Sequence, residues 1–171
     1  MQQLLLSRDA RAARQRQWLE AFPGQTLLCL TVQPPGPEKR THESLVIGEA
    51  GLEALKELFG SRVKQWEAWD LETGYEAFLL VDYPPQASKR TAVQLEQTHP
   101  LGRLMDVDVL WGFPPQAVGR EQLGLPPRQC LLCPREVRFC MRAGTHTRAE
   151  LLQRVKQMVE TYERNNAIQK A

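Results

Sequence analysis

The amino-acid sequence predicts an α+β or α/β fold with a single mixed sheet of about five or six strands and about three helices. Three observations predict this class. Short apolar and β-branched runs alternate with segments whose apolar residues recur at helical spacing. The 171 residues, 42% of them hydrophobic and 25% charged, are enough to bury one substantial core. Without an internal repeat or an interdomain linker, residues 1–171 are predicted to form a single domain.

The expected helices and strands follow from local signals. We expect helices over residues 8–22, before Pro23-Gly24, over 50–59, stopped by Gly60, and over 147–163. The last of these begins with the capping-box pattern Thr147-x-x-Glu150. The expected strands are residues 26–32, 44–47, 63–69, 75–82, 89–96 and 104–111. Residues 33–40 contain three prolines and are predicted to form a loop of restricted shape.

Charge and hydropathy exclude several function classes. A net charge of +2 is too small to indicate nucleic-acid binding. No apolar run reaches the length of a membrane span, and residues 1–6 are too short an apolar stretch for a signal peptide. We therefore expect a cytoplasmic protein without membrane or nucleic-acid partners, and with reduced cysteines.

The most informative stretch is residues 98–109, which includes His99, Gly102 and Arg103 and then a strand with two aspartates. In a strand, side chains at alternate positions point to opposite faces. One face would carry Leu104, Asp106, Asp108 and Leu110, and the other Met105, Val107, Val109 and Trp111. The second face is apolar enough to pack on a core, while the first presents two carboxylates.

Paired carboxylates on one strand favour a hard cation such as Mg²⁺, because two nearby negative charges repel each other. Gly102 supplies a flexible turn, and Arg103 supplies a fork of donors suited to phosphate. Together these residues indicate metal-assisted phosphoryl or nucleotidyl transfer. Glu96 and Glu76 are rival candidates for a third carboxylate. The competing interpretation is an edge strand with a solvated acidic face.

Two basic regions have open interpretations. Lys39 and Arg40 end the proline-rich loop, which either holds phosphates or is a plain connection. The helix over residues 8–22 is basic, and this face is either solvated or a docking surface for an acidic protein or for phosphates. Its arginines are Arg8, Arg11, Arg14 and Arg16.

A cysteine-rich segment, residues 128–146, precedes the C-terminal helix. It contains the pattern Cys130-x2-Cys133-x6-Cys140-x5-His146. Three thiols and an imidazole are the ligand set of a tetrahedral structural zinc site. The alternatives are unrelated thiols or redox chemistry.

Several separated motifs resemble the citrate lyase holo-acyl-carrier-protein synthases, the apo-citrate lyase phosphoribosyl-dephospho-coenzyme A transferases. The resemblance extends over nearly the whole chain. It rests on Arg11, Arg14 and Gln15, residues 35–39, residues 73–76, Lys89, Glu96, residues 99–104, residues 106–109, residues 127–133, Cys140, Arg142 and His146. By analogy, the resemblance implies a nucleotidyltransferase-like single domain.

The resemblance also implies a reaction. Enzymes of this family transfer a prosthetic group from 2′-(5″-triphosphoribosyl)-3′-dephospho-CoA to a serine of the citrate lyase acyl carrier protein, the γ subunit, and release pyrophosphate. Asp106 and Asp108 would then hold Mg²⁺. Phosphates would be bound by Lys39, Lys89, Gly102 and Arg103, and His99 or Glu96 would accept the serine proton. The alternative is a non-catalytic, zinc-stabilised docking or binding module for an acyl carrier protein or a nucleic acid.

Overall fold

The structure is a computed structural model that describes residues 2–169. Its centre is one five-stranded sheet in the order β2-β3-β1-β4-β5, and all four strand pairings are antiparallel. The strands are β1 (Thr26–Val32), β2 (Val63–Leu71), β3 (Gly74–Val81), β4 (Asp106–Trp111) and β5 (Gln116–Ala117). Of the two expected classes, α+β is the one observed.

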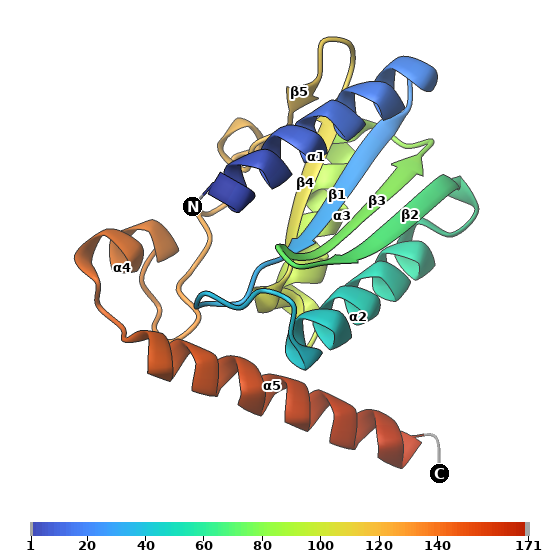
Figure 1. Cartoon of the computed structure of the whole chain (residues 1–171). Helices are drawn as coiled ribbons and strands as arrows, with labels where there is room; N and C mark the ends of the chain where they lie inside the picture. The colour runs from blue at the N-terminus through green and yellow to red at the C-terminus, as the bar shows by residue number, and fades with distance from the viewer. Residues whose placement is uncertain (1, 170–171) are drawn as a thin grey trace.

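The described residues form five α-helices rather than about three. They are α1 (Gln2–Ala21), α2 (His42–Phe59), α3 (Pro85–Thr98), α4 (Val137–Ala143) and α5 (Arg148–Gln169). Helix α1 lies across one face of the sheet, and α2 and α3 lie on the other (Figure 1). Helix α5 runs below the sheet next to α2, while α4 lies beyond the β4 side of the sheet.

Strand β1 is the centre of the core, and all seven of its residues are buried. Leu28, Leu30 and Val32 pack into the larger cluster with α2, α3 and α5. Leu27 and Cys29 point to the opposite face, where Leu19 of α1 covers them. Because both faces are covered, the sequence of β1 is a continuous apolar run rather than an alternating one.

The strand expected over residues 44–47 is wrong, because these residues lie in α2. Thr41 caps this helix: the Thr41 hydroxyl accepts from the Ser44 backbone N–H, and the Ser44 hydroxyl accepts from the Thr41 N–H. Residues 44–47 thus continue the helical spacing that leads to Leu55 and Phe59. Helix α2 also approaches β3 closely, since a Cβ on Gly48 would clash with the ring of Tyr75.

The strand expected over residues 89–96 is also wrong, because these residues belong to α3. Pro85 stands in the first turn of this helix. Backbone N–H groups in the first turn make no hydrogen bond within the helix, so a proline, which has no N–H, is tolerated there. The buried residues Lys89, Ala92 and Glu96 follow helical spacing and face β4 and its surroundings. The alternation of Val93 and Leu95 with polar residues, on which the strand was predicted, is too short to distinguish the two periods.

The C-terminal helix is confirmed and is longer than expected. Its capping box is present, because the Thr147 N–H donates to Glu150 Oε2 at 2.7 Å and the Glu150 N–H donates to Thr147 Oγ1 at 3.2 Å. Val155 and Val159 bury against the main core. Within residues 2–169, no helix combines the length and the apolarity needed to cross a bilayer.

Candidate functional site

The two aspartates of β4 lie on the sheet face that α1 covers. Met105, Val107 and Val109 are buried in the main core, whereas Asp106 and Asp108 are exposed, so the alternation predicted for this strand is confirmed. Successive residues on one face of a strand are about 6–7 Å apart between Cα atoms. One cation can therefore contact both carboxylates.

Strand register places a third carboxylate on the same face. Thr31 of β1 pairs with Asp106 on one side and with Glu76 of β3 on the other. Glu76, Thr31 and Asp106 thus form a row across three strands. Glu76 is buried, and its carboxylate receives Arg14 Nη2 at 2.6 Å and Arg11 Nη1 at 3.5 Å. Two of the basic residues of α1 are therefore paired with an acid on the sheet.

The electrostatic setting of Asp108 favours a cation. The protein atoms crowded around its carboxyl group partly desolvate it, and the negative charge of Asp106 adds to this, so the pKa of Asp108 is raised. Among the described residues, no cationic side chain forms an ion pair with Asp108. A bound divalent cation would relieve both the repulsion and the missing pairing.

Lys89 and Glu96 hold the edge of β4 rather than projecting into open solvent. Within residues 2–169, the outer edge of β4 has no neighbouring strand beyond the short pairing with β5. Lys89 Nζ donates to the Val107 carbonyl at 2.6 Å, and the Val107 N–H donates to Glu96 Oε1 at 3.1 Å. Both side chains are buried. These contacts satisfy the backbone of the residue between the two aspartates.

Further contacts fix Glu96 and Gly102 at the end of α3. The second carboxylate oxygen of Glu96 accepts from Arg120, which forms an ion pair with it. Gly102 begins a single 3₁₀ turn, Gly102–Leu104, packed against the carbonyl groups of Leu95 and Glu96. A Cβ at residue 102 would clash with both carbonyls. The structure thus gives Gly102 a packing reason to be glycine.

His99 caps the end of α3, just before this turn, and lies beside α5. Its Nδ1 accepts from the Leu101 N–H at 3.1 Å, and its ring lies 5.6 Å from that of Tyr162. Burial lowers the pKa of His99, against a smaller opposing effect of Glu57. His99 is thus a neutral hydrogen-bond acceptor that orders the turn before β4.

Arg103 and Arg128 connect β4 to the C-terminal segment. Arg103 Nη2 donates to the carbonyls of Gln129, at 3.1 Å, and Cys130. Arg128 Nη1 pairs with Asp106 Oδ1 at 3.0 Å, while its other terminal nitrogen donates to the carbonyls of Arg103 and Met105. The Asp106 side chain is still 59% exposed, so it remains open to a further partner.

The two basic residues of the proline-rich loop point in different directions. Arg40 Nε pairs with Asp70 at 2.8 Å and Nη1 with Glu72 at 3.1 Å, at the turn between β2 and β3. Lys39 instead donates to the Pro34 carbonyl at 2.6 Å. Lys39 therefore stays near the end of β1, next to the start of β4.

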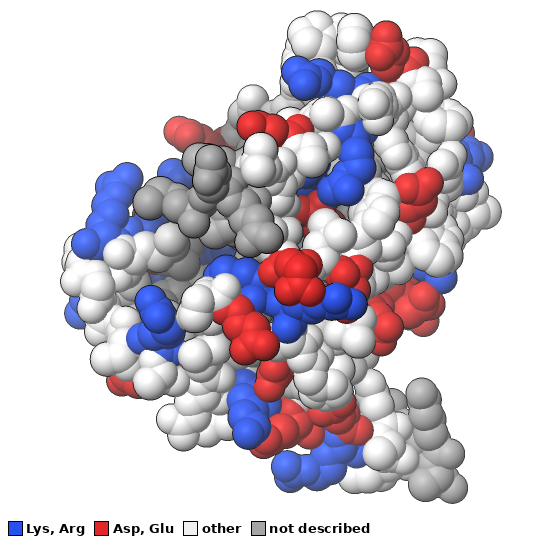
Figure 2. Space-filling view, in the orientation of Figure 1, with Lys and Arg blue, Asp and Glu red and all other residues white. Residues whose placement is uncertain are grey.

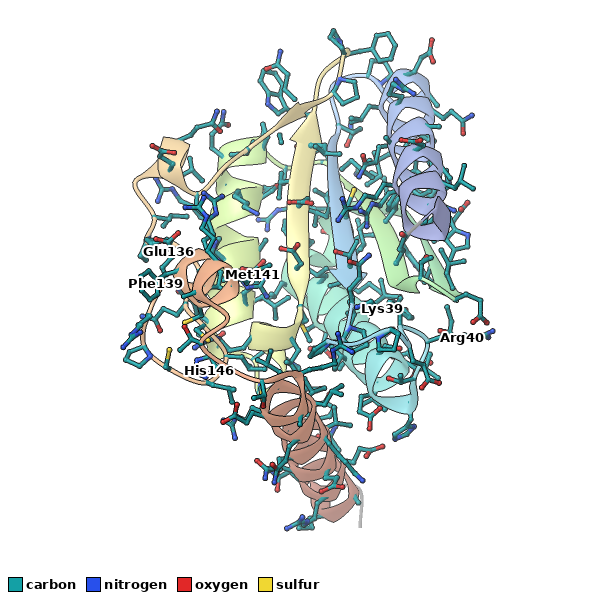
Figure 3. All side chains as sticks on the ribbon, turned by 60° about the vertical axis from the view of Figure 1, so that its left-hand side comes forward. Lys39, Arg40, Glu136, Phe139, Met141 and His146 are labelled. Atoms are coloured by element: carbon teal, nitrogen blue, oxygen red, sulfur yellow. The ribbon has the colours of Figure 1, made fainter. Side chains whose placement is uncertain are left out.

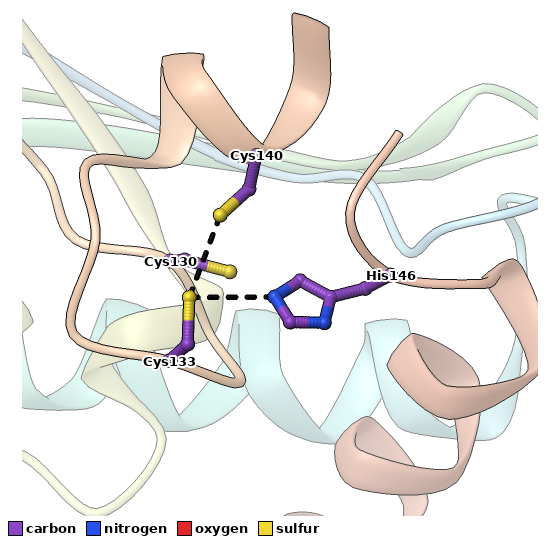
Figure 4. A group of neighbouring side chains, drawn as sticks. All are labelled: Cys130, Cys133, Cys140 and His146. Carbon is purple, nitrogen blue, oxygen red and sulfur yellow. Dashed lines mark hydrogen bonds between the residues drawn. The ribbon is translucent and has the colours of Figure 1, made fainter. Parts of the chain in front are cut away.

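The four predicted metal ligands come together. Cys130 and Cys133 lie on the loop before α4, Cys140 on α4, and His146 just before α5 (Figure 4). Their ligand atoms all lie within 4.8 Å of one another. Cys133 Sγ is 3.4 Å from both Cys140 Sγ and His146 Nε2. This cluster of three thiols and one imidazole fits a structural zinc site.

The thiols of this cluster differ in acidity. Burial alone would raise the pKa of Cys130, but hydrogen bonds from the Leu132 and Cys133 backbone N–H groups lower it overall. Burial and hydrogen bonds with the neighbouring thiols raise the pKa of Cys140 to about 11. Cys29, the remaining cysteine, is buried under α1 and accepts from Gln15. A metal bound at the cluster would displace the proton of Cys140.

Arg128 and Arg120 were not among the predicted site residues. Both act over long sequence separations, Arg128 on Asp106 and Arg120 on Glu96. Arg128 lies within residues 127–133, which carry the family resemblance, but nothing in that segment assigned it a role. Arg120 had only the signal of a cation in an irregular segment. Such a signal does not identify the partner, because the partner lies on another element.

The fold and the site together define a class of protein. An α+β sheet that presents paired carboxylates next to arginines is an arrangement suited to phosphoryl-transfer chemistry. Comparisons with known proteins are more specific. Residues 1–162 match the family model described as apo-citrate lyase phosphoribosyl-dephospho-CoA transferase, and the chain belongs to this family.

Curated relatives carry the same description. The proteins of Escherichia coli O1:K1 and of Shigella boydii serotype 18 are each 37% identical to this chain. Each alignment covers 92% of this chain and 86% of the relative. Both relatives are named apo-citrate lyase phosphoribosyl-dephospho-CoA transferase. The resemblance inferred from separated motifs is thereby confirmed.

Proposed function

We propose that this protein transfers the phosphoribosyl-dephospho-CoA prosthetic group from 2′-(5″-triphosphoribosyl)-3′-dephospho-CoA to a serine of the acyl carrier protein of citrate lyase. Membership of the family supports the reaction. The carboxylate pair of β4, open to solvent beside Arg128, is the observation that supports the site.

The proposed step forms one bond and breaks another. The serine hydroxyl oxygen bonds to the phosphorus nearest the ribose, the bond from that phosphorus to the pyrophosphate oxygen breaks, and the serine proton is released to solvent. The products are a phosphodiester and pyrophosphate. A Mg²⁺ ion held by Asp106 and Asp108 would neutralise the charge on the triphosphate.

The residues around the aspartates have distinct proposed roles. Arg128 pairs with Asp106 and is close enough to exchange that contact for a phosphate oxygen. Arg103 orders the segment that carries Arg128, through the carbonyls of Gln129 and Cys130. Lys89 and Glu96 position β4, because their charged groups contact the Val107 backbone.

We also propose that zinc occupies the Cys130, Cys133, Cys140 and His146 cluster and has a structural role. The ligand set is complete with four protein atoms, which is the arrangement of closed structural zinc sites. The cluster joins the loop before α4, α4 itself and the start of α5. Zinc would therefore hold this part of the chain against the start of β4.

Intact mass of the carrier protein tests the function. The apo-carrier, the triphosphoribosyl donor and this protein are incubated with Mg²⁺ or with EDTA. We expect the carrier to gain the mass of the donor minus pyrophosphate only with Mg²⁺. No gain with authentic substrates and folded protein would contradict the proposal, and carrier binding without modification would then support a docking module.

A further inference from the structure

A cavity of about 370 Å³ lies at the end of the sheet where β1 ends and β4 begins. Its lining includes Thr31 and Asp106, which belong to the carboxylate row. Its wall is mainly apolar. The apolar side chains are Val32, Ile47, Leu104, Leu131, Val137, Met141 and Val155.

This wall is assembled from distant parts of the chain. Met141, on α4, lines the cavity, whereas Lys39, on the proline-rich loop, lies beside it and contacts the Pro34 carbonyl. In Figure 3 they flank the lower ends of β1 and β4. Met141 is 76% exposed despite lining the cavity. The exposed Met141 and the half-buried Leu104, Leu131 and Val137 offer an apolar surface to a ligand with an apolar part.

Positive charge surrounds the same cavity. Arg103 and Arg128 are among its lining residues. Lys39 contacts the carbonyl of Pro34, which also lines the cavity. Arg148, at the start of α5, lies next to Gly36. Burial and the charge of Arg148 lower the pKa of Lys39.

On the face shown in Figure 2, basic and acidic side chains are interspersed, in accord with the net charge of +2. Around the cavity, four cations from four separate segments converge: Arg103 and Arg128 line it, and Lys39 and Arg148 lie beside its proline-rich side. Asp106 is the only acidic residue among the described residues that line it. An apolar cavity with a cationic rim suits a nucleoside that carries phosphates.

We propose that this cavity binds the adenosine diphosphate part of the dephospho-CoA half of the donor. The inference rests on the proposed function, since that function supplies the donor. The nucleoside would pack on the apolar wall, and Lys39 and Arg148 would bind the diphosphate that leads to the pantetheine arm. Asp106 at the cavity mouth would then face the phosphoribosyl end of the same donor.

Calorimetry with 3′-dephospho-CoA tests this binding without any transfer reaction. The full-length protein is titrated with 3′-dephospho-CoA, and adenosine 5′-diphosphate and pantetheine are added as competitors. We expect adenosine 5′-diphosphate to displace dephospho-CoA, while pantetheine does not. Displacement by pantetheine alone would overturn the proposal.

Two pairs of variants locate the site. Met141→Glu places a negative charge on the cavity wall, whereas Phe139→Glu places one on the same helix in another hollow. Arg148→Ala removes a rim cation, whereas Arg164→Ala removes an exposed cation further along α5. We expect Met141→Glu and Arg148→Ala each to weaken dephospho-CoA binding about tenfold, with the two controls unchanged.

The outcome separates this proposal from the proposed function. If wild-type protein modifies the carrier but Met141→Glu and Arg148→Ala bind dephospho-CoA normally, the cavity assignment fails and the function stands. If dephospho-CoA binding is lost as expected but no carrier is modified, the function fails and the cavity assignment stands. If Phe139→Glu weakened dephospho-CoA binding as much as Met141→Glu does, the cavity assignment would also be overturned. The loss of binding would then come from the added negative charge and not from its place in the cavity.

Discussion

Neighbouring residues of β4 have different roles because their side chains and backbone groups point in different directions. Asp106 and Asp108 point to the sheet face on which α1 lies and remain exposed there, while the side chain of Val107 enters the core. The Val107 backbone points to the sheet edge, where Lys89 and Glu96 satisfy it. The geometry of the carboxylate pair therefore depends on two buried charged residues of α3.

We expect Glu96→Leu to lower the free energy of unfolding by about 2–4 kcal/mol. The change leaves both the Val107 N–H and Arg120 without their partner. Urea denaturation measures the effect, and Glu49→Leu on the exposed side of α2 is the control. An unchanged free energy of unfolding for Glu96→Leu would show that the contact of Glu96 with the edge of β4 does not stabilise the fold.

His99 gives a pH dependence of stability. Burial lowers its pKa in the folded state, so the unfolded state gains a proton first as the pH falls. The pKa of histidine in the unfolded chain is about 6.5. Above that pH neutral His99 makes its full contribution to the free energy of unfolding, and this contribution declines as the pH falls below it.

His99→Asn should weaken this acid sensitivity, because an amide oxygen replaces Nδ1 as acceptor for the Leu101 N–H without titrating. Denaturant titrations at pH 7.5 and pH 5.5 measure the loss in wild type and variant. The exposed His42→Asn is the matched control and should retain the wild-type loss. If His99→Asn lost as much stability as the wild type between pH 7.5 and pH 5.5, His99 would be excluded as the group responsible for the acid sensitivity.

Helices and strands with a strong local pattern were predicted correctly from the sequence. Strand β1 and the alternation of β4 follow from local pattern alone, and so does the capping box of α5. Residues 44–47 and 89–96 were misassigned as strands because four to eight residues do not separate a strand from a helix. In both segments the helix is favoured by a feature at its start, the Thr41 cap or Pro85.

The cysteine-rich segment, residues 128–146, is expected to hold a zinc ion. Purified protein should contain about one zinc per chain by elemental analysis, since four protein ligands complete one tetrahedral site. Cys133→Ser should lose most of this zinc and increase proteolytic cleavage within residues 128–146. Cys29→Ser, outside the cluster, should keep the zinc. Wild-type protein that folds without metal would contradict a structural zinc.

At the scale of the whole molecule, the site joins segments that are far apart in the sequence. The row from Glu76 through Thr31 to Asp106 exists only because β1 lies between β3 and β4. Arg128 reaches Asp106 from the segment beyond β5. The chemical types of the central residues could be predicted from sequence, but these juxtapositions depend on strand order, which no local pattern encodes.

The aspartates of β4 are the proposed site of the transfer reaction. The most direct measurement is the single-turnover rate of carrier modification, followed by intact mass, for wild type, Asp106→Asn and Asp82→Asn. Asp82 is an exposed aspartate outside the site. We expect Asp106→Asn to lower the rate at least about 100-fold while the protein remains folded, and Asp82→Asn to leave it unchanged. A wild-type rate in folded Asp106→Asn would contradict the assignment of the site to β4.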